Sequence, residues 1–212
     1  MRRYRDRADA GRALGERLRH LAGEDVVVLG APRGGVVVAE EVARALGAPL
    51  DVVLVRKLPL PFARETAFGV IGEDGHAIVD EALVAQLRLD PAAIERTKEE
   101  VLDVIREEAR AYRAVRPPEP IEGRVALLVD DGLATGYTML GAAQWARARR
   151  PSRLVLAAPV SSDSAEQLLR PHVDELVCPV VDPGFVGVSA YYERFDPVDD
   201  EGVVEALRTV DS

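Results

Sequence analysis

The residues best suited to chemistry in this 212-residue chain follow one apolar stretch. Val125 to Val129 is an unbroken apolar run, which is typical of a strand buried on both faces of a parallel sheet. Asp130 and Asp131 end the run, and the next residues read Gly-Leu-Ala-Thr-Gly-Tyr-Thr. Two neighbouring carboxylates can accept hydrogen bonds from the hydroxyls of a sugar or hold a cation through water. The stretch therefore predicts a ligand site at the carboxyl end of a strand.

The turn beyond the acidic pair suits a phosphate. The pattern predicts a helix from about Tyr137 to Arg149, so that Thr-Gly-Tyr-Thr at 135–138 lies at its N-terminus. A helix N-terminus offers unpaired N–H groups and the positive end of the helix dipole, and both favour an anion. The carboxylates would repel that anion, so the two features must serve different parts of one ligand. A sugar phosphate has both parts.

A second strand–loop–helix unit carries glycines and an arginine. The turn Gly-Ala-Pro-Arg-Gly-Gly follows the predicted strand Val26–Leu29 and precedes the predicted helix Val36–Leu46. Gly34 and Gly35 would let the backbone approach a ligand closely, and Arg33 would add a positive charge. These residues favour a diphosphate-binding loop. An ordinary turn with a solvated arginine is the alternative that the residues leave open.

A third segment is basic and stiffened by two prolines. It runs from Arg56 to Glu65 after the predicted strand Asp51–Val55. Lys57 is one of only two lysines among 27 basic residues, which indicates a requirement for a compact ammonium group. The segment could instead be an exposed connector.

The stretch from Val125 to Thr138 resembles the phosphoribosyl-diphosphate (PRPP) motif of type I phosphoribosyltransferases. That motif has an apolar strand, two acidic residues, a short spacer and Thr-Gly-x-Thr, and it is far more specific than a lone glycine motif. In the family, the counterparts of Asp130 and Asp131 hold the ribose hydroxyls. The resemblance implies that the 5′-phosphate is bound by Ala134, Thr135, Gly136, Tyr137 and Thr138.

The resemblance also covers the other two segments. The diphosphate-binding residues that it implies are Arg33, Gly34, Gly35, Arg56 and Lys57. Family members often carry a non-proline cis peptide beside the residue that corresponds to Arg33, and a mobile basic loop, matched loosely by Arg64, closes over PRPP. The implied catalytic residues are Arg33, Lys57 and Asp131, with Mg²⁺ bound through PRPP and, by way of water, Asp130 and Asp131.

The sequence says less about the molecule that would accept the phosphoribosyl group than about PRPP, which would donate it. Hypoxanthine–guanine enzymes of the family carry an aspartate where this chain has Ala134, which argues against a 6-oxopurine mechanism that uses that base. The segment 182–193 resembles the base-contacting segment of the purine enzymes, with Phe185 stacking on the base and Val186 beside it. Core packing is the alternative role of Phe185. The chain is most similar to an uncharacterised group of predicted phosphoribosyltransferases that share its Arg-Gly-Gly, Arg-Lys-Leu and Val-Asp-Asp-Gly-x-Ala-Thr-Gly blocks.

The elements that must position these residues indicate an α/β fold with a central, mainly parallel sheet flanked by helices. We expect a single phosphoribosyltransferase-like domain over residues 1–212. Residues 67–116 read as an insertion with a hairpin and a long helix, and residues 179–212 as a small C-terminal hood and tail. The long helix could pack on the domain or pair with a second subunit, so a homodimer is possible.

Composition excludes several function classes. A net charge of -9 argues against nucleic acid as the main partner, and it means that local basic groups must attract an anionic substrate. The apolar runs are strand-sized, so we expect no membrane span, and no apolar segment typical of a signal peptide follows Met1. A lone cysteine, Cys178, excludes an internal disulfide and fits the reducing cytoplasm.

Together these patterns predict a Mg²⁺-dependent transferase of nucleotide metabolism. It would move the phosphoribosyl group from PRPP to a nitrogen nucleophile such as a nucleobase and release diphosphate. A non-catalytic protein that senses PRPP or a nucleotide is one alternative. A receiver-like protein, which is phosphorylated on an acidic pocket, is another.

Overall fold

The computed structural model describes residues 3–209, except for the side chains at positions 64 and 65. Its centre is a five-stranded sheet in which all neighbouring strands are parallel, as predicted. In spatial order the strands are β2 (Leu50–Val52), β1 (Val26–Gly30), β6 (Val125–Val129), β7 (Arg153–Ala157) and β9 (Glu175–Val177). All residues of β1 and β6 are buried, which is why these strands read as unbroken apolar runs.

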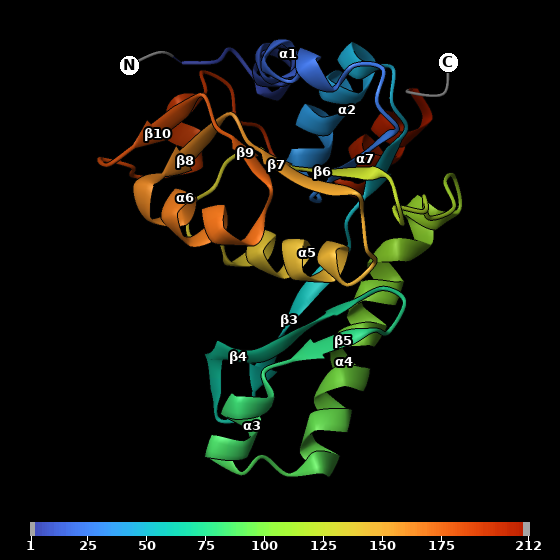
Figure 1. Ribbon diagram of the computed structural model, residues 1–212, viewed down its shortest axis with the longest axis vertical. Coiled ribbons are helices and arrows are strands. Elements are labelled where there is room, and N and C mark those ends of the chain that lie inside the picture. Colours follow the sequence, from blue (N-terminus) through green and yellow to red (C-terminus); the bar gives the residue numbers. More distant parts are fainter. Residues whose placement is uncertain (1–2, 210–212) are drawn as a thin grey trace.

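Helices cover both faces of the sheet (Figure 1). One face packs against α1 (Arg7–Arg17), α2 (Gly34–Leu46) and α7 (Asp200–Thr209). The other packs against α5 (Tyr137–Arg147) and α6 (Asp163–Leu169). Successive residues of a strand point to opposite faces, so Val28 joins the first layer and Val27 the second. Within residues 3–209, every helix is too short or too polar to span a bilayer.

The strand order changes direction between β1 and β6. The chain passes from β1 outward to β2, and from β6 outward on the other side to β7 and β9. Gly30 and Val129, the last residues of β1 and β6, are paired, and the Ala31 N–H donates to the Val129 carbonyl at 2.9 Å. The loops after these two strands are therefore neighbours. Open α/β sheets bind ligands at such a switch point.

An insertion lies beyond α5 (Figure 1). It consists of a three-stranded antiparallel sheet and two helices: β3 (Val55–Leu60), β4 (Ala63–Gly72), β5 (Ala77–Val79), α3 (Glu81–Leu87) and α4 (Pro91–Arg113). The Asp90 carboxylate caps α4 by accepting a hydrogen bond from the Ala92 N–H at 3.2 Å. The predicted hairpin and long helix are both present.

The structure corrects both readings of residues 56–65, as a basic loop that closes over the ligand and as an exposed connector. They form most of β3 and the beginning of β4, and the strand predicted over 51–55 ends at Val52. Leu58 and Leu60 are buried between more exposed neighbours, which is the alternation of a half-buried strand. Pro59 lies at a shift in the pairing register, where a missing N–H is tolerated. The two prolines therefore explain why the sequence pattern did not indicate a strand here.

The hood contains β10 (Val180–Asp182), which pairs in parallel with β8 (Val160–Ser162), and a 3₁₀ helix at Val188–Tyr191. β7 ends at Ala157 and β8 begins at Val160, so the apolar run over 154–160 is divided between two strands. Ser162 caps α6, because its hydroxyl accepts a hydrogen bond from the Ala165 N–H at 3.0 Å.

A buried ion pair joins α4 to the central sheet. Asp51 of β2 is 2% exposed, and its carboxylate lies 2.6 Å from the Arg113 guanidinium, which also binds Glu73 at the end of the hairpin. Burial raises the pKa of Asp51, and Arg113 opposes that rise. Arg113 thus anchors both the helix and the hairpin of the insertion.

We expect Arg113→Met to lower the free energy of unfolding by about 3 kcal/mol, because it leaves a buried carboxylate without its cation. Urea unfolding at pH 7 measures the change. Arg106→Met is the matched control, because Arg106 lies on the same helix with Asp103 at 3.7 Å and both side chains are largely exposed. The control should change stability by less than about 1 kcal/mol. Equal effects of the two substitutions would contradict the anchoring role of Arg113.

Candidate functional site

The acidic pair lies in the turn directly after β6. The Asp131 N–H donates to the Asp130 Oδ1 at 2.8 Å. Burial and the neighbouring Asp131 carboxylate raise the pKa of Asp130 well above its usual range. Burial also raises the pKa of Asp131, and the Arg7 guanidinium opposes that rise. Two carboxylates kept close together and partly out of water are poised to accept hydrogen bonds from a ligand that brings donors or a cation.

The diglycine turn packs against this pair. A Cβ atom on Gly35 would lie 2.9 Å from the Asp130 Cα, and one on Gly34 would collide with the Asp131 Oδ2. Only residues without side chains therefore fit here, so the two loops predicted to act together do meet. The peptide bond between Pro32 and Arg33 is cis, at the position where a cis peptide was expected.

The predicted phosphate loop leads into an open helix end. Gly136, with φ of 77°, stands at the N-cap of α5, where no side chain accepts a hydrogen bond from the first turn. Thr135, Tyr137 and Thr138 are exposed, and the Ser162 hydroxyl fixes the loop by donating to the Ala134 carbonyl at 2.6 Å. The first N–H groups of α5 are thus available to an anion.

Three of the predicted basic residues, Arg33, Arg56 and Lys57, have a partner within the chain. The Arg33 Nε lies 3.2 Å from the Asp200 Oδ1 of α7, and Arg56 pairs with Glu108 of α4. The Lys57 Nζ lies 4.6 Å from the centre of the Tyr137 ring. These ion pairs are about half-exposed, so each contributes roughly 0–1 kcal/mol and can be exchanged for a ligand phosphate. The side chain of Arg64 lies outside the described residues.

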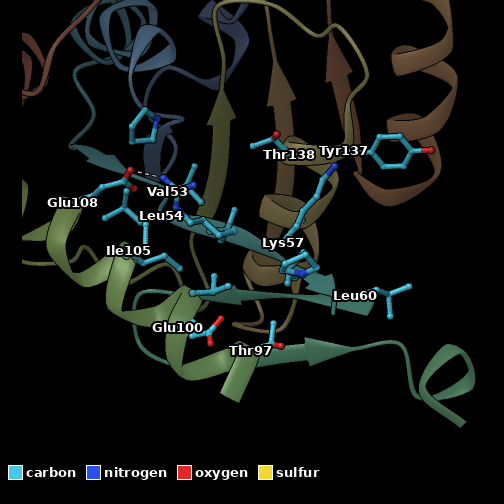
Figure 2. Close-up of a pocket in the computed structure, with 18 of the residues that line it drawn as sticks. Val53, Leu54, Lys57, Leu60, Thr97, Glu100, Ile105, Glu108, Tyr137 and Thr138 are labelled. Atoms are coloured by element: carbon cyan, nitrogen blue, oxygen red, sulfur yellow. Dashed lines mark hydrogen bonds and ion pairs between the residues drawn. The ribbon is translucent and has the colours of Figure 1, made fainter. Parts of the chain in front are cut away.

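A cavity of about 820 Å³ brings several predicted residues together (Figure 2). Arg56 and Lys57 from β3 face Tyr137 and Thr138 from the start of α5 across it, and Figure 2 shows Lys57 extending towards Tyr137. Residues of α4 form the opposite wall, including Thr97, Glu100, Ile105 and Glu108. The sequence left the role of this helix open. The cavity borders the elements predicted to bind phosphate, whereas the acidic pair lies outside its lining.

The residues predicted to bind a base do not line this cavity. Phe185 is half-buried in the hood, where its ring stacks on Tyr191 with centroids 5.4 Å apart and an angle of 19° between the planes. Val186 beside it is 84% exposed. In this arrangement Phe185 contributes to the packing of the hood, and base stacking stays a prediction.

Sequence reasoning missed two residues that hold Asp131. The Arg7 Nε lies 2.7 Å from the Asp131 Oδ2, and the Tyr192 hydroxyl donates to the Asp131 carbonyl at 2.6 Å. Arg7 is 124 positions away from Asp131 in sequence and stands among several other arginines. Nothing in its spacing links it to the acidic pair, so only the folded chain could identify it.

The close contact between the two loops can be tested by adding one methyl group. Gly34→Ala should lower the free energy of unfolding by about 1–3 kcal/mol, because the new Cβ meets the Asp131 carboxylate and lies 2.7 Å from the Arg7 Nε. Gly202→Ala in α7 is the control, since its Cβ would have no neighbour nearer than 3.3 Å. Thermal or urea unfolding measures both. A Gly34→Ala protein as stable as the wild type would show that the loops are farther apart.

Comparison with known proteins places the chain in a family. The family described as "Phosphoribosyl transferase domain" matches residues 5–193. Two Mycobacterium tuberculosis proteins, from strains CDC 1551 and H37Rv and each named "Putative phosphoribosyl transferase", are 44% identical over 207 residues. These residues are 98% of this chain and 47% of the relatives, so the chain spans about half the length of the curated relatives it matches.

The crystal structure of TT1426 from Thermus thermophilus is also similar. It is 45% identical, and the match covers 98% of each chain with a TM-score of 0.90. The likeness therefore includes the insertion as well as the sheet. On the family match and these relatives, the chain belongs to the phosphoribosyl transferase domain family.

Proposed function

We propose that this chain transfers the phosphoribosyl group of PRPP to a nitrogen nucleophile such as a nucleobase and releases diphosphate. One observation carries the proposal: an acidic pair, an open helix N-terminus and a diglycine turn meet at the carboxyl ends of the adjacent strands β1 and β6. A sugar that bears a phosphate at one end and a diphosphate at the other has groups for all three features. Membership of the family supports the same choice.

PRPP would bind across the switch point of the sheet. Its 5′-phosphate would accept hydrogen bonds from the first turn of α5 and from Thr135 and Thr138. Its ribose hydroxyls would donate to Asp130 and Asp131. Its diphosphate would lie against the diglycine turn beside Arg33. Lys57 would reach it from the cavity, whose lining includes Pro32 next to Arg33.

The acidic pair also fits a magnesium ion that arrives with PRPP. Within residues 3–209, no group of three or more histidine, cysteine, aspartate or glutamate side chains could hold a metal ion alone. Mg²⁺ commonly binds to one or two carboxylates together with substrate phosphates, so Asp130 and Asp131 would hold it, directly or through water. When bound, Mg²⁺ would offset the negative charge that develops on the diphosphate.

The transfer breaks the bond between the anomeric carbon and the diphosphate oxygen and forms a carbon–nitrogen bond. The acceptor nitrogen supplies the electron pair and loses a proton, and diphosphate leaves with the electrons of the broken bond. The anomeric carbon gains positive character in the transition state. Arg33 and Lys57 would stabilise the leaving group as its charge grows, and the bound 5′-phosphate would keep the ribose oriented.

A PRPP-sensing protein that binds without catalysis is a second candidate. The observation in its favour is that Asp200 and Glu108 already hold Arg33 and Arg56, two of the three cations predicted for the diphosphate. The weakness of such exposed pairs favours the transferase, because PRPP can displace the carboxylates at little cost.

The direct test mixes the chain with Mg²⁺, PRPP and a panel of bases that includes adenine, uracil, hypoxanthine and orotate. We expect diphosphate release that depends on both the protein and one of the acceptors. The control omits the base. A folded sample that binds PRPP and releases no diphosphate with any base would reject the transferase in favour of the sensor.

Replacing both acidic residues tests the ribose assignment. Asp130→Asn combined with Asp131→Asn should weaken Mg-PRPP binding by about fifty-fold or more, because two charged acceptors are lost at nearly constant shape. Calorimetry measures the affinity, and circular dichroism checks the fold. Asp103→Asn, on the exposed face of α4, should leave the affinity unchanged. An unaltered affinity in the double variant would show that the ribose does not bind to the acidic pair.

A further inference from the structure

The first residue of α1 reaches into the candidate site. The Arg7 Nε lies 2.7 Å from the Asp131 Oδ2, and its Nη1 donates to the Asp196 carbonyl at 2.7 Å. The guanidinium lies over the Phe195 ring at 3.8 Å from its centre, and the side chain is only 11% exposed. Arg7 is therefore held by a carboxylate, a carbonyl and an aromatic face at once.

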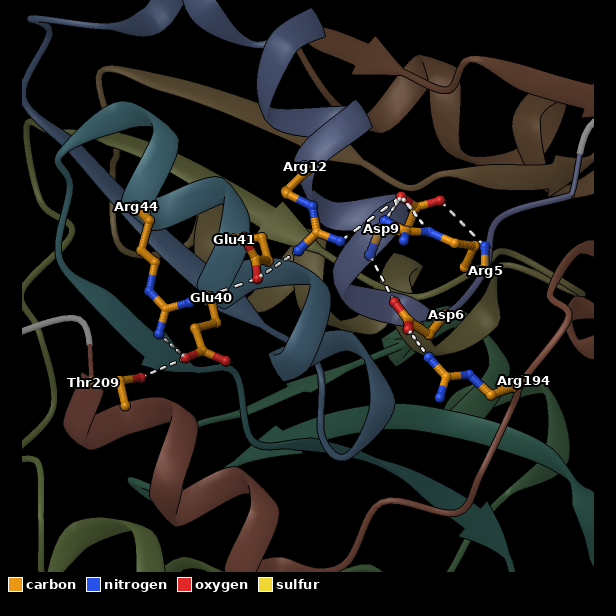
Figure 3. Close-up of polar contacts among 9 residues, drawn as sticks. All are labelled: Arg5, Asp6, Asp9, Arg12, Glu40, Glu41, Arg44, Arg194 and Thr209. Atoms are coloured by element: carbon orange, nitrogen blue, oxygen red, sulfur yellow. Dashed lines mark hydrogen bonds and ion pairs between the residues drawn. The ribbon is translucent and has the colours of Figure 1, made fainter.

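The backbone that carries Arg7 is also fixed. The Asp6 carboxylate caps α1 by accepting from the Asp9 N–H at 2.9 Å, and its other oxygen accepts from Arg194 at 2.6 Å (Figure 3). Just before it, the Tyr4 N–H donates to the Tyr191 carbonyl at 2.9 Å. The N-terminal segment thus pairs with the hood, and this pairing determines where Arg7 lies.

These contacts occupy one oxygen of each acidic residue. The Arg7 Nε donates to the Asp131 Oδ2, and the Asp131 N–H donates to the Asp130 Oδ1. In the part of the chain that the structure describes, no donor of another residue reaches the Asp130 Oδ2 or the Asp131 Oδ1. Two adjacent carboxylates therefore keep one unshared oxygen each. The number matches the two neighbouring hydroxyls of a ribose.

We propose that Arg7 is a positioning residue for sugar recognition, which turns the Asp131 carboxylate so that its second oxygen is available to a ribose hydroxyl. Arg7 is also a cation within hydrogen-bond distance of Asp131, so it offsets repulsion between the two carboxylates. The Tyr192 hydroxyl assists by holding the Asp131 carbonyl. This inference rests on the proposed function, because it assigns the ribose to the acidic pair.

A purely structural role would predict a different outcome. If Arg7 only tied α1 to the hood, its loss would weaken all ligands of the site to a similar degree. If it orients Asp131, its loss should weaken a ligand that contains the ribose and spare one that lacks it. Inorganic diphosphate with Mg²⁺ is the ribose-free probe, since it would use the diglycine turn and Lys57. It shares with Mg-PRPP any contact that the acidic pair makes through the metal, so an additional loss for Mg-PRPP reports on the ribose.

The experiment compares the affinities of Mg-PRPP and Mg-diphosphate by calorimetry in the wild type, Arg7→Gln, Arg7→Lys and Arg12→Gln. Arg7→Gln should bind Mg-PRPP about tenfold more weakly and Mg-diphosphate within about twofold of the wild type. Arg7→Lys restores the charge without the planar fork and should fall in between. Arg12→Gln is the control, because Arg12 lies on the same helix and pairs with Glu41 at 3.2 Å, away from Asp131 (Figure 3).

Equal losses for both ligands in Arg7→Gln, or no loss for either, would overturn the inference and leave the proposed function in place. If Arg7→Gln does not fold, Arg7→Lys decides the matter, and a loss confined to Mg-PRPP is again the expected result. A folded wild-type chain that binds Mg-diphosphate but not Mg-PRPP would reject the proposed function, and the inference with it.

Discussion

The parallel pairing of β1 with β6 is the constraint on which the rest of the structure depends. The register that pairs Gly30 with Val129 ends both strands at the same level, so the loops that follow them emerge side by side. The diglycine turn can then lie against the acidic pair, where any side chain larger than hydrogen would collide. Hydrophobic burial holds this pairing in place, because every residue of both strands is enclosed between helical layers. The candidate site is thus positioned by two fully buried apolar strands.

Local patterns in the sequence were sufficient to predict the centre of the fold. The run from Val125 to Val129 and its counterpart at Val26 contain the signature of buried parallel strands, and the residues that follow carry their chemistry within a few positions. Strand, turn and helix are contiguous in such units, so the acidic pair, the phosphate loop and the diglycine turn could all be placed in advance. That the two turns would meet followed from the topology of open α/β sheets.

What could not be predicted depends on contacts between distant segments. Arg7, the pairing of Arg33 with Asp200, and the wall that α4 contributes to the cavity join residues far apart in sequence, and no local pattern encodes them. The structure of the segment 56–65 was predicted wrongly for another reason. Its two prolines indicated a loop, but Leu58 and Leu60 are buried within the insertion, and this burial overrode the local signal. The insertion thus contributes Lys57 to the site on a strand.

The most direct measurement of the central claim is a crystal structure of the complex with Mg²⁺ and PRPP. The account predicts the 5′-phosphate at the first turn of α5, the diphosphate against Gly34 and Gly35, and the two ribose hydroxyls within hydrogen-bond distance of the Asp130 Oδ2 and the Asp131 Oδ1. It also predicts that Arg7 keeps its contact with the other oxygen of Asp131. A complex in which PRPP lies wholly within the cavity beside α4, and its ribose contacts neither carboxylate, would contradict the account.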